Sequence, residues 1–233
     1  MTIDTSEPGA SPPASVPAAV PASGPERACL AGGLVILAFA WTGPLRGWSA
    51  EYFTGHMVLH VVLIAIVAPL LAAGFARRLP RGARPVLAAP LLAAAFEFVV
   101  MWGWHLPAAH EWARGSAVGF ALEQGAFLAA GTWVWAAALA PGAGLPGSVA
   151  LLGTSMHVTL LGAIVTLPGR AIYATCGGPA LSPLADQTLG GTLMLAVATP
   201  IYLLGGLHVA RRGLREGRER GDGLTREPTD RAG

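Results

Sequence analysis

The chain reads Glu-Tyr-Phe-Thr-Gly-His-Met-Val-Leu-His over residues 51–60 and then continues to Leu71 without a charged residue. An apolar run of this length is typical of a helix that crosses a membrane. On a helix, a spacing of four residues places the imidazoles of His56 and His60 on one face, one turn apart. Ionisable side chains are costly at the edge of a membrane span, so this pair is a candidate functional site.

The composition also indicates a membrane protein. Hydrophobic residues make up 53% of the 233 residues and charged residues only 12%, and the mean hydropathy is +0.55. A soluble domain carries about 25% charged residues. The apolar segments have helical length and lack the alternating ten-residue pattern of a membrane β-barrel. All fifteen basic residues are arginines that flank apolar segments, a pattern that gives no indication of nucleic-acid binding.

We predict an all-α, polytopic membrane helix bundle with about six transmembrane helices. Residues 1–27, rich in Pro, Ala and Ser, are expected to form a disordered cytoplasmic tail, and residues 211–233 an arginine-rich one. The transmembrane helical domain covers residues 28–210. A helix needs about 20 residues to cross the hydrocarbon core, and this length places the spans at about 28–45, 52–74, 86–106, 118–140, 148–168 and 187–209.

The placement of the arginines predicts the orientation of these spans. Four arginines follow the second span and seven lie in the C-terminal segment, whereas three other loops contain one each. With six spans, both arginine-rich segments lie on the same side, which we assign to the cytoplasm together with both termini. The opposite, extracytoplasmic side then receives His56, His60, His105, His110, Glu123, Asp186 and Cys176.

The residues expected at this outer face are of the types that bind metals. Neutral imidazole suits copper, zinc or iron, and thioethers favour reduced copper. Met57 follows His56 directly and Met101 precedes His105 by about one helical turn, so both are candidate sulfur ligands. The alternative interpretation is that each histidine only forms hydrogen bonds at the membrane interface, where an amphipathic ring is stable.

Four further ionisable residues have less distinct patterns. His110 lies in a short amphipathic stretch and is expected at the surface, and His208 is expected at the cytoplasmic interface. His157 falls near the middle of its span, where an interhelical hydrogen bond is an equal alternative to a functional role. Glu97 lies well inside the third span. It either bonds to a neighbouring helix, the favoured interpretation, or belongs to an inward proton or metal-ion route.

Four stretches of the chain form an ordered set of motifs. They are His-Met-Val-Leu-His over 56–60 with Val-Ala-Pro-Leu-Leu over 67–71, Trp-His-Leu-Pro over 104–107, Leu-Gly-Ala-Ile-Val-Thr over 161–166 with Tyr173, and Ser-Pro-Leu-Ala-Asp-Gln over 182–187 with Gly190, Gly191 and Met194. This set resembles the CtaG family of cytochrome c oxidase assembly factors, the group first associated with caa-type oxidase. The resemblance covers about residues 28–210.

The chain departs from the pattern of that family at several positions. Many members have a His-x-x-Glu-His segment where this chain reads Phe-Ala-Leu-Glu-Gln over 120–124, so that only Glu123 matches. Leu59 stands where a Gln is frequent and Leu195 where a Trp is found, and members often have seven spans. The ligand set implied by the resemblance is therefore reduced to His56, His60, His105, Glu123 and Asp186.

The resemblance implies a membrane protein, not an enzyme, that helps to insert copper into a haem-copper cytochrome c oxidase. It further implies multi-pass insertion in the plasma (inner) membrane of a bacterium, with oxidase subunits of the respiratory chain and a copper donor protein as partners. We expect His56, His60 and His105 to bind copper transiently, and Met57 or Met101 to help hold Cu(I). Glu123 and Asp186 are expected to orient the imidazoles.

Two other classes of membrane protein remain open. A small haem-binding protein would need histidines from two helices at matching depth, and His105 or His157 would have to supplement the pair on the second span. A metal-dependent membrane enzyme of the hydrolase type places a glutamate directly after the first histidine of its pair, where this chain has Met57.

Overall fold

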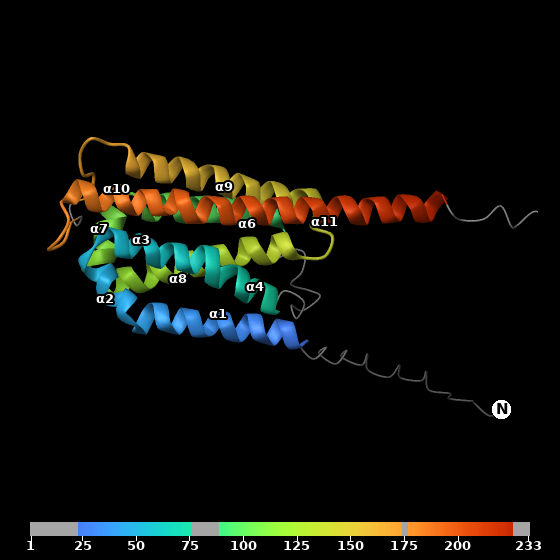
Figure 1. Cartoon of the computed structure of the whole chain (residues 1–233), viewed down its shortest axis with the longest axis horizontal. Coiled ribbons are helices and arrows are strands. Elements are labelled where there is room, and N and C mark those ends of the chain that lie inside the picture. Colours follow the sequence, from blue (N-terminus) through green and yellow to red (C-terminus); the bar gives the residue numbers. More distant parts are fainter. Residues whose placement is uncertain (1–22, 76–88, 174–176, 226–233) are drawn as a thin grey trace, which may run out of the picture.

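The computed structural model describes residues 23–75, 89–173 and 177–225, which fold into a bundle of helices (Figure 1). Apart from one isolated bridge between Gly178 and Leu181, these residues contain no β-structure, so the all-α prediction is confirmed. Most of the predicted N-terminal tail, the arginine-rich loop after the second span and Cys176 lie outside the described residues.

The first half of the chain contains two sharp bends. α1 (Gly24–Thr42) is followed by α2 (Pro44–Glu51) at 48°, and α6 (Pro90–Trp104) is followed by α7 (Pro107–Gly115) at 75°. Each second helix begins with a proline, which has no amide hydrogen to continue the preceding helix and is well suited to the first helical position. Between the bent pairs, α3 (Phe53–Val61), η1 (Val62–Val67) and α4 (Ala68–Phe75) form one continuous helix.

The second half consists of long helices. α8 (Ala117–Leu139) and α9 (Gly144–Thr166) are joined by a short turn. α10 (Pro183–Leu193), η4 (Met194–Ala198) and α11 (Thr199–Thr225) then form a last continuous helix. α9 packs against both α6 and α11, while α10 packs against α3. The helix that carries the histidine pair is thus held between α8 and the last helix.

Helices occupy all six predicted positions, but fewer of them have the length and composition of a membrane span. Among the described residues three qualify, at Phe53–Gly74, Gly144–Thr166 and Pro183–Glu219, and up to five if each bent pair is one span. α8 is not among them, although it has 23 residues. It contains Glu123 and Gln124, both fully buried inside the bundle. The structure therefore supports three to five spans instead of the predicted six.

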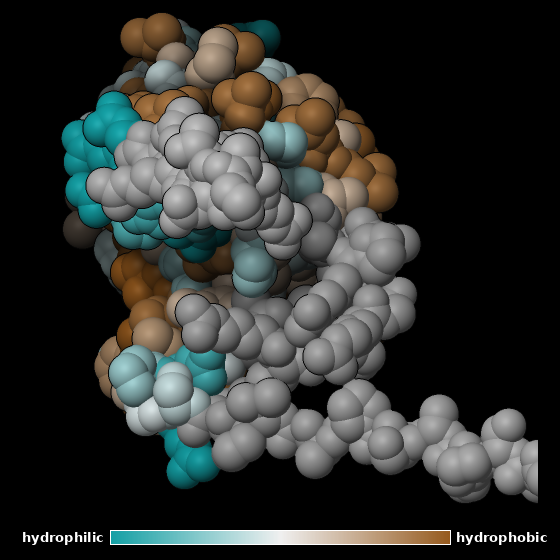
Figure 2. Space-filling view, turned by 90° about the vertical axis from the view of Figure 1, so that its right-hand side faces the viewer, coloured by the Kyte–Doolittle hydropathy of each residue, from teal (hydrophilic) through white to brown (hydrophobic). Residues whose placement is uncertain are grey.

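The two ends of the bundle differ in the elements that they contain (Figure 1). α1 begins and α11 ends at one end, where α11 continues beyond the bundle and carries the arginines of residues 211–218. α2, α7 and α10 gather at the opposite end. Viewed from the first end, hydrophobic residues cover much of the flanks of the bundle (Figure 2). Apolar flanks are what a helix bundle surrounded by lipid requires.

A buried polar network ties the helices together at η1. The carbonyl of Ile64 accepts hydrogen bonds from the indole of Trp135 at 3.1 Å and the hydroxyl of Tyr202 at 3.3 Å. Tyr202 also donates to the carboxylate of Glu97, as does Thr154 at 2.7 Å. π-Helical turns replace the i→i+4 backbone hydrogen bonds of an α-helix with i→i+5 bonds and often occur at functional sites. Glu97 thus joins α6 to α9 and α11, which agrees with its favoured interpretation as an interhelical contact.

Candidate metal centre

Four histidines from three segments of the chain form a row inside the bundle. α3 supplies His56 and His60, His105 follows the end of α6, and His110 lies in α7. None of the four is more than 6% exposed. The ring centroids of His110 and His56 are 5.0 Å apart, those of His56 and His60 4.3 Å, and those of His60 and His105 5.8 Å. We call these four residues the histidine row.

One carboxylate lies against the middle of the histidine row. Glu123 of α8 is fully buried, and its Oε1 and Oε2 atoms lie 3.1 Å and 3.0 Å from Nε2 of His56. Its Oε2 also lies 3.3 Å from Nε2 of His60 and accepts a hydrogen bond from the side-chain amide of Gln124 at 3.0 Å. The predicted carboxylate ligand therefore contacts both histidines of the predicted pair.

Several ring nitrogens of the row make no hydrogen bond to the described part of the chain. They are both nitrogens of His60, both of His110 and Nε2 of His105. Nδ1 of His105 lies 2.7 Å from the carbonyl oxygen of Met101, so it donates its proton there and leaves Nε2 with a free lone pair. A buried polar atom without a partner costs about 1–3 kcal/mol. A neutral imidazole offers one lone pair, so the rings of His60, His105 and His110 can each supply one ligand nitrogen, and with Glu123 they make a donor set that fits copper, zinc or iron.

The prediction that His110 lies at the surface is wrong. The residue is fully buried, because the 75° bend before α7 turns the side of that helix with His110 and Ala113 onto the bundle. Its ring lies 5.2 Å from that of Phe53 and 4.6 Å from that of Tyr173. One ligand atom from each of His56, His110 and Glu123 lies within 4.8 Å of the other two. His110 is therefore a member of the candidate site that the amphipathic pattern of α7 did not reveal.

Among the predicted site residues, Asp186 has the surroundings that differ most from the prediction. Its Oδ2 accepts hydrogen bonds from the amides of Phe53 at 2.7 Å and Gly177 at 2.9 Å, and its Oδ1 from the amide of Thr54 at 2.9 Å. α3 has no side-chain cap of its own, so this carboxylate from α10 caps the free amides at its start. Asp186 thus positions the helix that carries His56 and His60, instead of orienting an imidazole directly as predicted.

We expect Asp186→Ala to lower the stability of the protein through this cap. The change leaves buried amides of α3 without an acceptor, which costs about 1–3 kcal/mol for each group. The unfolding temperature of the detergent-purified variant should fall clearly below that of the wild type. Glu51→Ala, at an exposed carboxylate just before α3, is the matched control and should be nearly neutral. Equal unfolding temperatures for the two variants would contradict the capping role.

The two predicted sulfur ligands are both buried in the core. Met57 faces α10, since a Cβ atom placed on Gly190 would lie 2.9 Å from its Cγ. This close approach of α3 and α10 needs a residue without a side chain. Met101 supplies its backbone carbonyl to His105, while its side chain belongs to the hydrophobic core. The assignment of either thioether as a copper ligand stays a prediction.

His157 and His208 lie outside the histidine row. The His157 ring packs against Phe98 of α6 at 5.3 Å, and neither of its nitrogens bonds to another described residue. The interhelical hydrogen bond considered for His157 is therefore not found within the described ranges. His208 is exposed on α11, as expected for an interfacial position.

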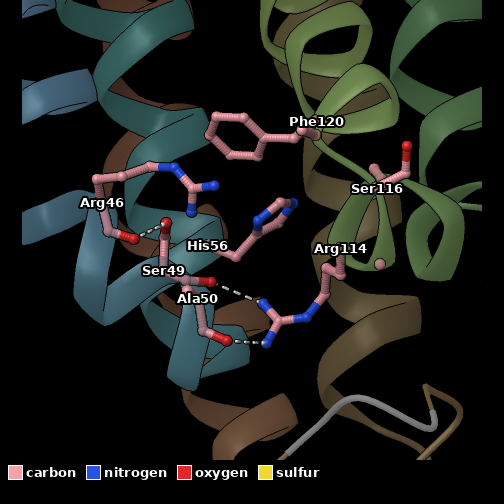
Figure 3. Close-up of a pocket in the computed structure, with 10 residues that line it drawn as sticks. Arg46, Ser49, Ala50, His56, Arg114, Ser116 and Phe120 are labelled. Atoms are coloured by element: carbon pink, nitrogen blue, oxygen red, sulfur yellow. Dashed lines mark hydrogen bonds between the residues drawn. The ribbon is translucent and has the colours of Figure 1, made fainter.

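A pocket of about 170 Å³ leads from the surface to His56 (Figure 3). Its walls come from α2, α7 and the start of α8, and none of its lining residues is acidic. Arg46 lies over the ring of Phe120 at 3.9 Å from its centroid, and Arg114 donates to the carbonyls of Ser49 at 2.8 Å and Ala50 at 3.1 Å. His56 is the one member of the histidine row that lines this pocket. It is therefore the member nearest to solvent through this opening.

The chain matches the protein-family model described as cytochrome c oxidase caa3 assembly factor (Caa3_CtaG) over residues 18–216. Neither the curated proteins nor the solved structures yield a match. The matched range contains every helix that contributes to the histidine row and Glu123. It confirms the resemblance that the four ordered motifs indicate.

Proposed function

This chain belongs to the cytochrome c oxidase caa3 assembly factor family, and we propose that it assists oxidase assembly by holding copper transiently at the histidine row. The observation that supports copper is the set of three buried imidazoles, those of His60, His105 and His110, whose ring nitrogens include atoms without a hydrogen-bond partner, gathered with His56 near Glu123. Neutral imidazole and carboxylate are ligands that copper accepts, and a site built mainly from imidazoles suits exchange of the ion. Copper is the cargo of this protein, and its function is assembly, not catalysis.

Each part of the site has a distinct role in this proposal. His56, His60, His105 and His110 supply ligand nitrogens, and Glu123 supplies negative charge that offsets the charge of the ion. Nδ1 of His105 is held by the Met101 carbonyl, which fixes the ring so that Nε2 is the atom available to a metal. Asp186 keeps the start of α3 in place. The protein thereby maintains a preformed donor set in the absence of its cargo.

We place the histidine row at the extracytoplasmic face of the plasma membrane. It lies toward the end of the bundle where α2 and α7 gather, opposite the arginine-bearing end of α11 (Figure 1). Arginine-rich segments next to membrane spans favour the cytoplasm, so both termini are assigned to that side. In this orientation the pocket over His56 faces the compartment in which a copper donor protein and the oxidase subunits would meet it.

The shape of the site disfavours a haem. The rings of the histidine row lie 4.3–5.8 Å from their neighbours, and the pocket of about 170 Å³ is small. Sites for drug-sized ligands have volumes of about 300–1,000 Å³, and a porphyrin needs a comparable slot between its axial ligands.

The hydrolase alternative has one observation in its favour. Two histidines and a glutamate also form the ligand set of some catalytic zinc sites, and His56, His110 and Glu123 are such a set. Such an enzyme needs a further base for the attacking water. No carboxylate lines the pocket that could serve as this base, and two arginines lie there instead. We therefore favour metal transfer over hydrolysis.

Deletion of this chain in its own host should lower the activity and the copper content of the oxidase while oxidase transcripts persist. The reason is that the oxidase polypeptides are made but their copper centres are not completed. Activity, transcript level and copper per oxidase are measured in copper-limited medium, with the wild-type strain as control. Rescue by excess copper would support delivery of the ion over a purely structural role. Normal oxidase copper content in the copper-limited deletion strain would refute the proposal.

A further inference from the structure

We propose that the histidine row contains two metal positions that share the carboxylate of Glu123. The outer position uses His56 and His110, and the inner position uses His60 and His105. This inference rests on the proposed function, because it concerns the number and arrangement of ions at the same row. The ligand class is a transition-metal ion that binds imidazole, with Cu(I) as the probe.

The spacing of the rings assigns the histidines to two pairs. When two imidazoles bind one ion through bonds of about 2.0–2.1 Å, their ring centroids lie about 5–6.5 Å apart, depending on the angle at the ion. The pair His110–His56, at 5.0 Å, and the pair His60–His105, at 5.8 Å, both fall in this range. The pair His56–His60, at 4.3 Å, is too close to share one ion in a tetrahedral or more open geometry. His56 and His60 therefore belong to different metal positions.

The length of the histidine row excludes a single ion that uses every ligand. Ligand atoms around one tetrahedral ion lie within about 3.5 Å of one another. His110 and His105 occupy opposite ends of a row of three successive ring contacts. Within the described residues, the three-ligand group with mutual distances below 4.8 Å contains His56, His110 and Glu123 but neither His60 nor His105. One ion at that group leaves the inner pair unused.

Glu123 has the geometry of a shared ligand. Nε2 of His56 lies within 3.1 Å of both of its oxygens, and Nε2 of His60 lies 3.3 Å from Oε2. A carboxylate has two oxygens with several lone pairs, so each oxygen can serve one ion. Its single negative charge, placed between the pairs, reduces the repulsion between two cations.

The surroundings of the two metal positions differ, so the histidine row has an outer end near the pocket and an inner end away from it. His56 lines the pocket that opens to the surface, whereas His60 does not. The rings of His60 and His105 instead face Phe127, at 4.2 Å and 5.9 Å. Two imidazoles and one carboxylate oxygen beside an apolar ring suit Cu(I), which accepts low coordination numbers and needs no water ligand. An ion that enters through the pocket therefore reaches the inner position by way of the outer one.

The test counts Cu(I) ions on the full-length, detergent-purified protein under anaerobic conditions, by titration against a chromophoric Cu(I) chelator. The wild type should bind two ions per chain. His105→Gln and His110→Gln should each bind one, and the double variant none with comparable affinity. His157→Gln is the matched control, because His157 is a partly buried histidine with unpartnered nitrogens outside the row, and it should bind two. Gel filtration and circular dichroism verify that each variant is folded.

X-ray absorption of the copper-loaded wild type supplies a measurement that needs no variant. Two positions predict an average of about two imidazole ligands per copper. One ion per wild-type chain, with three or four imidazoles and complete loss in either variant, would overturn the two-position arrangement while leaving the proposed function intact. Absence of any bound Cu(I) in the folded wild type would instead refute the proposed function itself. The two failures are therefore distinguishable.

Discussion

Replacement of Glu123 by alanine is expected to abolish copper binding along the whole histidine row and, with it, oxidase assembly. Glu123 is a buried acidic side chain in contact with the row, and it touches both His56 and His60. Its loss would leave a positive ion inside a buried site with no compensating charge, and uncompensated buried charges are very costly. Loss of even an indirect metal partner typically weakens binding about 10–100-fold, and a direct contact should have a larger effect.

Glu97→Ala is the matched control for Glu123→Ala. Glu97 is also a fully buried carboxylate, but it bonds to Thr154 and Tyr202 in the network at η1. Its removal should lower the unfolding temperature, because the buried hydroxyl of Thr154 loses its acceptor and that of Tyr202 keeps only the longer bond to the Ile64 carbonyl, while copper bound per folded chain stays at the wild-type level. Copper content and unfolding temperature of the purified variants separate the two effects. If both variants bind copper equally, Glu123 is only a structural partner of the histidines.

The parts of the site that the sequence predicted are those that depend on local spacing. His56 and His60 share a helix face because helical periodicity places residues four apart on one side, whatever the rest of the fold does. His105 and Glu123 were predicted from their expected place at the outer ends of their spans, and the structure places His105 in the histidine row and Glu123 against it. Helix positions were also predicted closely, since long apolar segments limit where helices begin and end.

The features that the sequence did not predict depend on contacts between distant segments. His110 was assigned to the surface because the direction of α7 is set by the bend at Pro107, which periodicity does not encode. Asp186 was assigned to the imidazoles, yet its partners are the backbone amides of Phe53 and Thr54, more than a hundred residues away. Three to five of the six predicted spans qualify by length and composition among the described residues, and α8, which contains the buried polar pair Glu123 and Gln124, is not one of them.

Substitution of each of the six histidines by alanine should divide them into two groups, those that are needed for oxidase assembly and those that are not. His56→Ala, His60→Ala and His105→Ala should each abolish oxidase assembly, with little loss of protein. The structure adds His110→Ala to this group, although its sequence pattern predicts a nearly silent change. His157→Ala and His208→Ala should be nearly silent, since neither side chain touches the row. Oxidase copper content is measured for each variant together with the abundance of the variant in the membrane.

The relation between function and abundance distinguishes a metal ligand from a packing residue. Nδ1 of His60 and both nitrogens of His110 make no hydrogen bond to the described residues, so truncation of either ring removes unpaired polar atoms at the same time as it opens a cavity. Removal of the unpaired polar atoms relieves a cost of about 1–3 kcal/mol per atom, which offsets much of the destabilisation caused by the cavity. These variants should therefore remain abundant. A ligand role therefore predicts loss of copper delivery without loss of protein. If abundance falls in step with oxidase copper, the imidazoles serve packing, and if all six variants assemble the oxidase normally, the row carries no metal.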